Sequence, residues 1–182
     1  PCDLEDCAHG CALTELGLGP ADLVAVVLQS LLEGIQLDRR TRDPLPARAA
    51  DPQRWLPGRS GCGICGHRHL EDVVRQPAAV GQGSAIASSA LEVALRQIEQ
   101  RQPLNAATGA IHAAAWARAD GSLVLVREDV GRHNALDKLI GAMQREGVDP
   151  ASGFALVTSR SSYELVAKAA TAGFPLLSAM SA

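Results

Sequence analysis

Apolar residues repeat at helical spacing in two stretches of the chain. Residues 3–18 are predicted to form one helix, with Asp3 as a candidate N-cap, and residues 81–102 form a second, clearer one that Pro103 ends. The apolar face of the first helix consists of Leu4, Cys7, Ala8, Cys11 and Ala12. The apolar face of the second consists of Ile86, Ala90, Val93, Ala94 and Ile98. Both stretches therefore indicate helices that pack one side against a core.

The C-terminal half alternates between short apolar runs and helical segments. Strands are predicted over residues 110–118, 123–128, 154–158 and 174–178, with a turn at 119–122 between the first two. Helices are predicted from 131–134 through Arg145 and over 163–172, where Gly173 ends the second. This order of strand, strand, helix, strand, helix, strand predicts an α/β sheet flanked by helices.

The segments between these two parts are less regular. Residues 23–32 are apolar enough for either a helix or a strand, since short apolar runs do not distinguish the two. Residues 38–60 are rich in Arg, Asp and Pro, and their lack of a steady period predicts a linker or meandering loop. A short helix is expected to begin at about His69.

Composition narrows the classes of protein to consider. The 182 residues are 47% hydrophobic and 20% charged, which indicates one globular domain, or one domain with a small lobe. No apolar run approaches the ~20 residues that cross a bilayer. The net charge of -3 and the 3% aromatic content argue against nucleic-acid binding. Five cysteines, an odd number, without a basic and then apolar leader pattern predict a cytoplasmic protein with reduced thiols.

A CxxC motif is the sharpest local feature. Cys62 and Cys65 stand among Gly61, Gly63 and Gly66, so the loop can expose its backbone N–H groups and its sulfur atoms. Such dipoles favour a thiolate, the form that attacks sulfur electrophiles. Sulfur carriage as a persulfide, disulfide exchange and half of a zinc site all fit the motif, and so does a structural or incidental role.

Two predicted strand-to-helix junctions are dense in polar residues. The segment 127–138 holds Arg132, His133 and Asn134 at a predicted helix start, and the segment 159–162 holds Ser159, Arg160 and Ser161 at the next one. Free backbone N–H groups and the helix dipole favour anions at such places, so the pair predicts a basic, hydroxyl-lined pocket for phosphate oxygens. The alternatives are a solvated charged face and simple N-capping by Ser159 or Ser161.

Two further groups have a plain structural interpretation. Cys7 and Cys11 lie one turn apart on an apolar helix face, where a small buried side chain is the default, although Cys2 and His9 are near. His112 on a predicted strand is more often a hydrogen-bonded core histidine than a ligand, although its small neighbours would let a ligand approach.

Taken in order, the motifs of this chain resemble one known family. They are Asp3-Leu-Glu-Asp6, Cys62-Gly-Ile-Cys65-Gly66, Thr108-Gly-Ala-Ile-His112, the segment Glu128 to Lys138, and Ser159-Arg-Ser-Ser-Tyr-Glu164. The set is similar to the formate dehydrogenase accessory sulfurtransferase family (FdhD). The resemblance implies a cytidine-deaminase-like three-layer α/β sandwich, here residues 61–182, with a small N-terminal lobe and linker, here residues 1–60. Family members usually form a homodimer. The chain is expected to be truncated at both ends relative to the family.

The resemblance also implies a function. Family members accept persulfide sulfur from a cysteine desulfurase and pass it to the molybdenum bis-molybdopterin guanine dinucleotide cofactor, which formate dehydrogenase then receives. The catalytic residues would be Cys62, which carries the persulfide, and Cys65, which supports it. The residues expected to bind the cofactor as a substrate are Arg132, His133, Asn134, Ser159, Arg160 and Ser161, and no intrinsic metal is expected.

Three alternatives bear on this interpretation. A zinc deaminase is disfavoured because the second helix start offers serines where such enzymes have paired cysteines. A non-catalytic module that binds the molybdenum cofactor and escorts it without transferring sulfur stays open. A zinc-stabilised domain that uses Cys62, Cys65 and a histidine is the third possibility.

Overall fold

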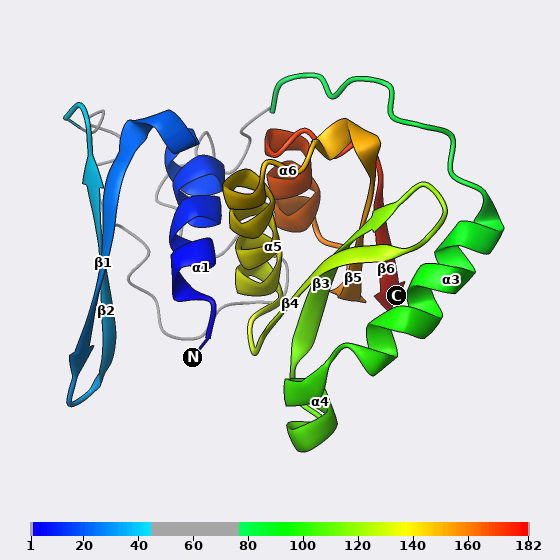
Figure 1. The fold of residues 1–182 in the computed structure, drawn as a ribbon, viewed down its shortest axis with the longest axis horizontal. Coiled ribbons are helices and arrows are strands. Elements are labelled where there is room, and N and C mark those ends of the chain that lie inside the picture. Colours follow the sequence, from blue (N-terminus) through cyan, green and yellow to red (C-terminus); the bar gives the residue numbers. More distant parts are fainter. Residues whose placement is uncertain (1, 45–76, 182) are drawn as a thin grey trace.

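The computed structural model describes residues 2–44 and 77–181, which form two sheets and the helices around them (Figure 1). The helices are α1 (Leu4–Cys11), α3 (Ser88–Gln100), α4 (Pro103–Thr108), α5 (Arg132–Glu146) and α6 (Tyr163–Thr171). The strands are β1 (Leu23–Leu31), β2 (Gly34–Thr41), β3 (His112–Arg118), β4 (Leu123–Asp129), β5 (Gly153–Arg160) and β6 (Leu177–Ser181). A π-helical turn (Ala12–Leu16) and two 3-10 turns (Pro20–Asp22 and Pro150–Ser152) complete the regular structure.

The main sheet has the strand order β4-β3-β5-β6 and forms the middle layer of a three-layer sandwich. β3 runs antiparallel to both of its neighbours, and β5 and β6 are parallel. Figure 1 shows α3 on one face of this sheet and α5 on the other. The predicted α/β fold with helices on both faces is therefore confirmed.

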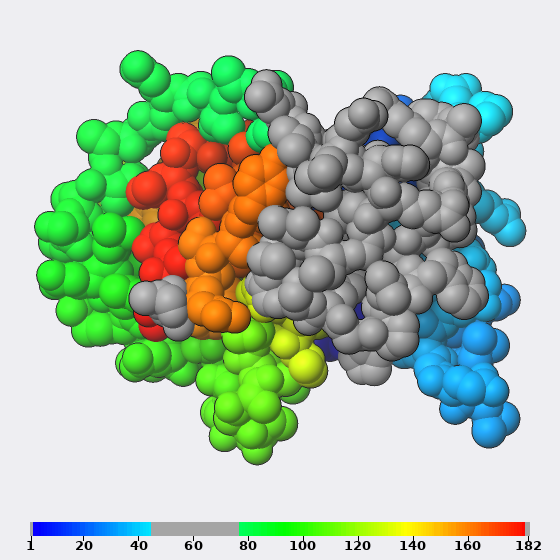
Figure 2. All heavy atoms as spheres, turned by 180° about the vertical axis from the view of Figure 1, so that it is seen from behind, coloured from blue at the N-terminus to red at the C-terminus, as the bar shows by residue number. Residues whose placement is uncertain are grey.

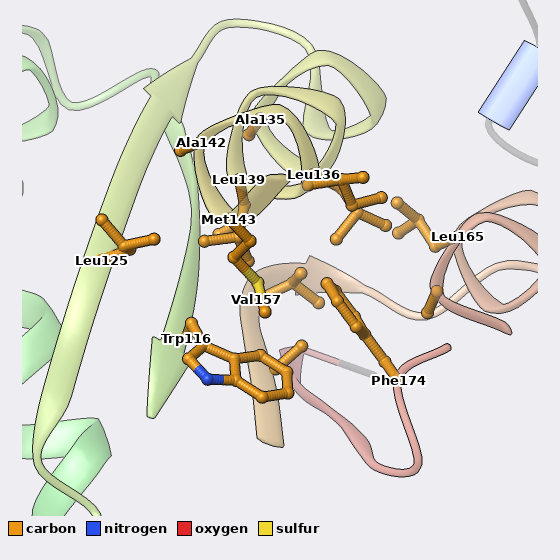
Figure 3. Close-up of a cluster of buried hydrophobic side chains, with 14 residues drawn as sticks. Trp116, Leu125, Ala135, Leu136, Leu139, Ala142, Met143, Val157, Leu165 and Phe174 are labelled. Atoms are coloured by element: carbon orange, nitrogen blue, oxygen red, sulfur yellow. The ribbon is translucent and has the colours of Figure 1, made fainter. Parts of the chain in front are cut away.

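The alternation of β3 divides the core between the two faces of the sheet. Ala113, Ala115 and Ala117 pack with Ala94 and Ile98 of α3. On the other face, Trp116 packs against Phe174 with ring centroids 4.9 Å apart and is surrounded by side chains of α5 and α6 (Figure 3). Alanines on β3 leave room for helices on both sides, so a chain with few aromatic residues still fills its core.

α5 is buried along most of its length because other elements cover it on several sides. Its residues 135–143 are all buried, between the sheet, α1 and α6. Its closest approach is to α1, where Gly141 faces the backbone of Asp6, and Gly10 faces the backbone of Asp137. A side chain at either glycine would overlap the opposite backbone, so these two glycines permit the contact.

The β1–β2 hairpin lies on the side of α1 away from α5 (Figure 1). It pairs from Leu23 with Thr41 to Leu31 with Gly34, so the apolar stretch 23–32 is a strand up to Leu31, and Leu32 belongs to the turn. β2 also takes up residues 38–41, so the expectation of a loop from residue 38 is wrong for these four, and 45–60 lie outside the described residues. The division into 1–60 and 61–182 stays a prediction. Among the described residues, no helix is both long and apolar enough to cross a membrane.

Three other sequence predictions need correction. Asp3 precedes α1 with a left-handed φ of 56°, and its side chain forms no capping hydrogen bond to the described residues. α3 begins at Ser88 and not at residue 81, because Gly81 and Gly83 favour irregular backbone over a helix. β6 begins at Leu177 and not at residue 174, because Phe174 turns into the core beside Trp116 and Pro175 has no N–H to donate to a strand. The short α4 was not predicted at all.

Candidate functional site

The topology brings both predicted junctions to one edge of the main sheet. β3 starts at the edge where its antiparallel neighbours β4 and β5 end. His112, the first residue of β3, pairs with Asp129, the last residue of β4. The starts of α5 at Arg132 and of α6 at Tyr163 follow these strand ends, so they flank the start of β3.

Asp129 shapes the first junction. Its Oδ1 accepts hydrogen bonds from the Gly131 backbone N–H at 2.8 Å and from Asn134 Nδ2 at 3.1 Å. Its Oδ2 lies 2.7 Å from the buried Lys138 Nζ, which also donates to the Glu128 carbonyl oxygen at 2.9 Å. Burial alone would raise the pKa of Asp129, but these hydrogen bonds and the Lys138 charge hold it below its usual value. The carboxylate thus fixes the turn before α5, and it engages the exposed Asn134 side chain as part of that turn.

The neighbouring Glu128 has a different structural role. It is buried, and its two carboxylate oxygens accept hydrogen bonds from the backbone N–H groups of Leu104 at 3.0 Å and Asn105 at 2.8 Å. These are first-turn N–H groups of α4, which have no partner within their own helix. Glu128 therefore caps α4 and points away from the start of α5.

At the second junction, the serine that caps α6 is not one of the two that the sequence suggested. Ser159 is buried in β5 and donates its hydroxyl to the Arg160 carbonyl oxygen at 3.2 Å. The N-cap of α6 is Ser162, whose Oγ accepts from the Leu165 N–H at 3.4 Å, so the alternative of capping by Ser159 or Ser161 is wrong. Arg160 and Ser161 are exposed. Figure 2 shows the part of the chain that contains α6 and β6, in orange and red, at the surface beside α3.

A direct contact joins the two helix starts. His133 Nε2 lies 3.2 Å from Glu164 Oε2, and the two side chains are only 19% and 13% exposed. On the same edge, burial and then the positive charge of Arg132 lower the pKa of His112. His112 is therefore mainly neutral at pH 7 and sits within the electrostatic influence of Arg132.

The structure thus brings together much of the predicted binding set. Arg132, His133 and Asn134 lie at one helix start, and Ser159, Arg160 and Ser161 lie at the end of β5 beside the other. Sequence reasoning missed Glu164, although it stands in the same Ser-Arg-Ser-Ser-Tyr-Glu segment as Arg160. For His112 it left two interpretations open, a hydrogen-bonded core residue or a ligand. Cys62 and Cys65 lie outside the described residues.

The remaining charged motif near the N-terminus has a structural role. Asp6 is buried, with Oδ2 2.7 Å from Arg127 Nε and Oδ1 2.6 Å from Arg145 Nη1. Arg145 also lies 2.8 Å from Glu5 through Nη2. These ion pairs hold α1 against α5 and β4. Within residues 2–44 and 77–181, no group of three or more His, Cys, Asp or Glu side chains is arranged to hold a metal ion.

Comparison with known proteins shows similarity to one family along the whole chain. The model of the FdhD/NarQ family matches residues 1–182. A protein of Xanthomonas euvesicatoria named "Sulfur carrier protein FdhD" is 50% identical over 183 residues, which cover 100% of this chain and 65% of that protein. The protein of the same name from Bordetella bronchiseptica is 47% identical over 184 residues and 66% of its length. The chain thus spans just under two thirds of the length of these relatives.

A solved structure has a similar fold. The crystal structure of a protein from Desulfotalea psychrophila, assigned as a formate dehydrogenase accessory protein, superposes with a TM-score of 0.70 at 20% identity. The similarity covers 100% of this chain and 66% of that one. The arrangement of the two sheets and their helices is therefore shared between the two proteins.

Proposed function

Because the chain belongs to the FdhD/NarQ family, we propose that it is a sulfur carrier that serves formate dehydrogenase. It receives sulfur from a cysteine desulfurase as a persulfide on Cys62. It passes this sulfur to the molybdenum bis-molybdopterin guanine dinucleotide cofactor, which it binds as a substrate. The observation that carries the proposal is the match along all 182 residues to proteins named as sulfur carriers.

The loading step is a thiol exchange that needs no external oxidant or reductant. The Cys62 thiolate attacks the outer sulfur of the donor's persulfide. A new S–S bond forms on Cys62, the donor's S–S bond breaks, and the donor cysteine leaves as a thiolate. Cys65 follows Cys62 by three residues in the sequence and is proposed to support this exchange.

The environment of two other cysteines supports the choice of Cys62. Burial and then the charge of Asp137 raise the pKa of the Cys7 thiol to about 11. Burial is also the main cause that raises the pKa of the Cys11 thiol. Both thiols are therefore protonated at neutral pH and are poor nucleophiles. Persulfide formation is expected elsewhere in the chain.

The sheet edge described above supports the choice of acceptor. A dinucleotide cofactor carries several phosphate groups, and phosphate oxygens bind well to arginine side chains and to free N–H groups at helix starts. Arg132 is the first residue of α5 and Arg160 is the last residue of β5, just before α6, so the two arginines lie on either side of the start of β3 at His112. We propose that this edge binds the phosphates of the cofactor while Cys62 presents the sulfur. A homodimeric state and a cytoplasmic location follow from the family resemblance and stay predictions.

Intact-protein mass spectrometry tests the carrier role. The chain is incubated anaerobically with a cysteine desulfurase and free cysteine, beside Cys62→Ala and the matched control Cys7→Ala. We expect a gain of one sulfur atom that reduction removes, in the original chain and in Cys7→Ala but not in Cys62→Ala.

Two results would contradict the carrier role. The first is a gain of sulfur in Cys62→Ala equal to that of the original chain. The second is no gain in any chain that circular dichroism shows to be folded. The second result would favour a module that binds the cofactor without carrying sulfur.

A further inference from the structure

Two pairs of a basic and an acidic side chain join α5 to α6, one turn apart. The first is His133 with Glu164, described above. The second is Asp137 with Lys168, where Nζ lies 2.9 Å from Oδ2 and 3.0 Å from Oδ1. Asp137 follows His133 by one helical turn on α5, and Lys168 follows Glu164 by one turn on α6. We call these the α5–α6 charge pairs.

The second pair is the more deeply buried. The side chains of Asp137 and Lys168 are 6% and 4% exposed. The turn after α1 supplies the other partners: Thr14 Oγ1 donates to Asp137 at 2.8 Å, and Lys168 Nζ donates to Glu15 Oε1 at 2.7 Å. Burial would lower the pKa of Lys168, but the carboxylates of Asp137 and Glu15 outweigh it and raise that pKa. The ammonium group therefore stays charged inside the protein.

A buried ion pair is a poor source of net stability, because desolvation of the two charges offsets most of their attraction. Its best-attested use is to specify one arrangement of the packed elements. The charges of Asp137 and Lys168 are not used in the proposed chemistry. Their contacts with each other instead concern the register between α5 and α6.

The order of the charges along the helices allows one register only. Both helices start at the same sheet edge, so they run in the same direction. A shift of α6 by one turn in one direction would place Glu164 beside Asp137, which are both acidic. The opposite shift would place Lys168 beside His133, which are both basic. Of these three registers, only the observed one places a basic side chain beside an acidic one at both positions.

We propose that Asp137 and Lys168 are positioning residues that hold the starts of α5 and α6 in register for binding of the cofactor's phosphates. This inference rests on the proposed function, because it assigns the purpose of the register to that substrate. Asp137 and Lys168 touch no substrate themselves. They act through His133 and Arg132 on α5, and through the segment that leads from Arg160 into α6.

A double variant separates positioning from stability. Asp137→Leu with Lys168→Met replaces the ion pair by apolar side chains of similar size, a change that is often neutral or stabilising in protein cores. The control is Arg145→Met, which breaks the charge contact with Asp6 at the far end of α5. Arg145 lies roughly 18 Å from His133 along the helix axis. GDP serves as the probe for the phosphate site, and calorimetry measures its affinity for the original chain and for each variant.

We expect the double variant to unfold at a denaturant concentration close to that of the original chain and yet to bind GDP at least roughly tenfold more weakly. Such a loss corresponds to about one charge-assisted hydrogen bond to phosphate. Arg145→Met should lose stability and keep its GDP affinity. The NMR signals of the His133 ring should move in the double variant and stay in place in Arg145→Met.

The results distinguish failure of this inference from failure of the proposed site. Full GDP affinity in a stable double variant would overturn the positioning role. If the double variant does not fold, Asp137→Asn is compared with Arg145→Met under conditions where both are folded, and equal affinities would overturn the role as well. If the original chain itself does not bind GDP, or if Arg132→Ala binds it equally well, the phosphate site of the proposed function is wrong.

Discussion

Replacement of Gly141 by alanine tests the close contact between α1 and α5. Gly141 lies inside α5, where alanine has a better helix propensity than glycine by about 1 kcal/mol. On that ground alone, Gly141→Ala should stabilise the protein. The tertiary structure predicts the opposite, because α1 crosses α5 at this residue without room for a side chain.

The size of the effect can be worked from the contact. A Cβ atom on Gly141 would lie 2.7 Å from the carbonyl carbon of Asp6 and 2.8 Å from the Gly10 nitrogen, whereas ordinary contacts begin at 3.4 Å. It would overlap the Asp6 carbonyl oxygen directly. The obstacle is backbone, so no side chain can rotate away. Clearing the Asp6 carbonyl carbon alone needs a separation of about 0.7 Å, and clearing the carbonyl oxygen, which lies closer still, needs more. Overpacking of this kind costs about 1–3 kcal/mol.

Separation of the helices has a second cost. The Asp6 carboxylate is within 2.7 Å of both Arg127 and Arg145, and these ion pairs would lengthen as α1 moves. We therefore take the upper part of the overpacking range and subtract the gain in propensity. The expected net change is a loss of about 2 kcal/mol in the free energy of unfolding.

Urea denaturation followed by circular dichroism measures this loss, with the slope of the transition compared between chains. Gln144→Ala is the control, because it changes propensity in the same helix at a partly exposed residue and should stay within about 0.5 kcal/mol. A stabilised Gly141→Ala chain would refute the close contact between α1 and α5. So would a loss no larger than that of the control.

Two further predictions follow from single residues. Glu128→Gln should leave one of the two N–H groups at the start of α4 without its carboxylate partner, so the amides of Leu104 and Asn105 should exchange with deuterium faster while α5 amides keep their rates. Equal protection in the variant would contradict the capping role. Burial and then the charge of Arg132 lower the pKa of His112, and burial and then the charge of Arg145 lower the pKa of His9. As pH falls below 6.5, the unfolded chain therefore binds more protons than the folded chain does. Stability should therefore decrease below pH 6.5, and His112→Gln should reduce that slope. An unchanged slope in the variant would disprove the contribution of His112.

Local patterns in the sequence were enough to predict the strands and helices from β3 to α6, although they missed the short α4 that precedes β3. Their periods are short, and a period of two or of 3.6 residues is visible within one element. The junction at Arg132 could be found in the same way, because an apolar strand followed by glycine and a polar cluster is also a local signal. The family resemblance came from such motifs in order along the chain.

Other features depended on contacts between residues far apart in the sequence. Glu128 and Asp129 are neighbours in a charged run, yet one caps α4 and the other shapes the start of α5. The sequence predicts Phe174 as the start of a strand, but its ring packs in the core against Trp116 of β3.

The sequence by itself determined the main helices and strands from β3 to α6 and the residues that stand at the two junctions, but it missed α4 and did not distinguish helix from strand over residues 23–32. Only the tertiary structure decided what the charged motif residues do. Asp6 meets Arg127 and Arg145, and Asp137 meets Lys168, across long stretches of chain. The physical reason is that a charge is equally compatible with solvent, a cap or a buried pair until the packing of the helices decides which partner is within reach.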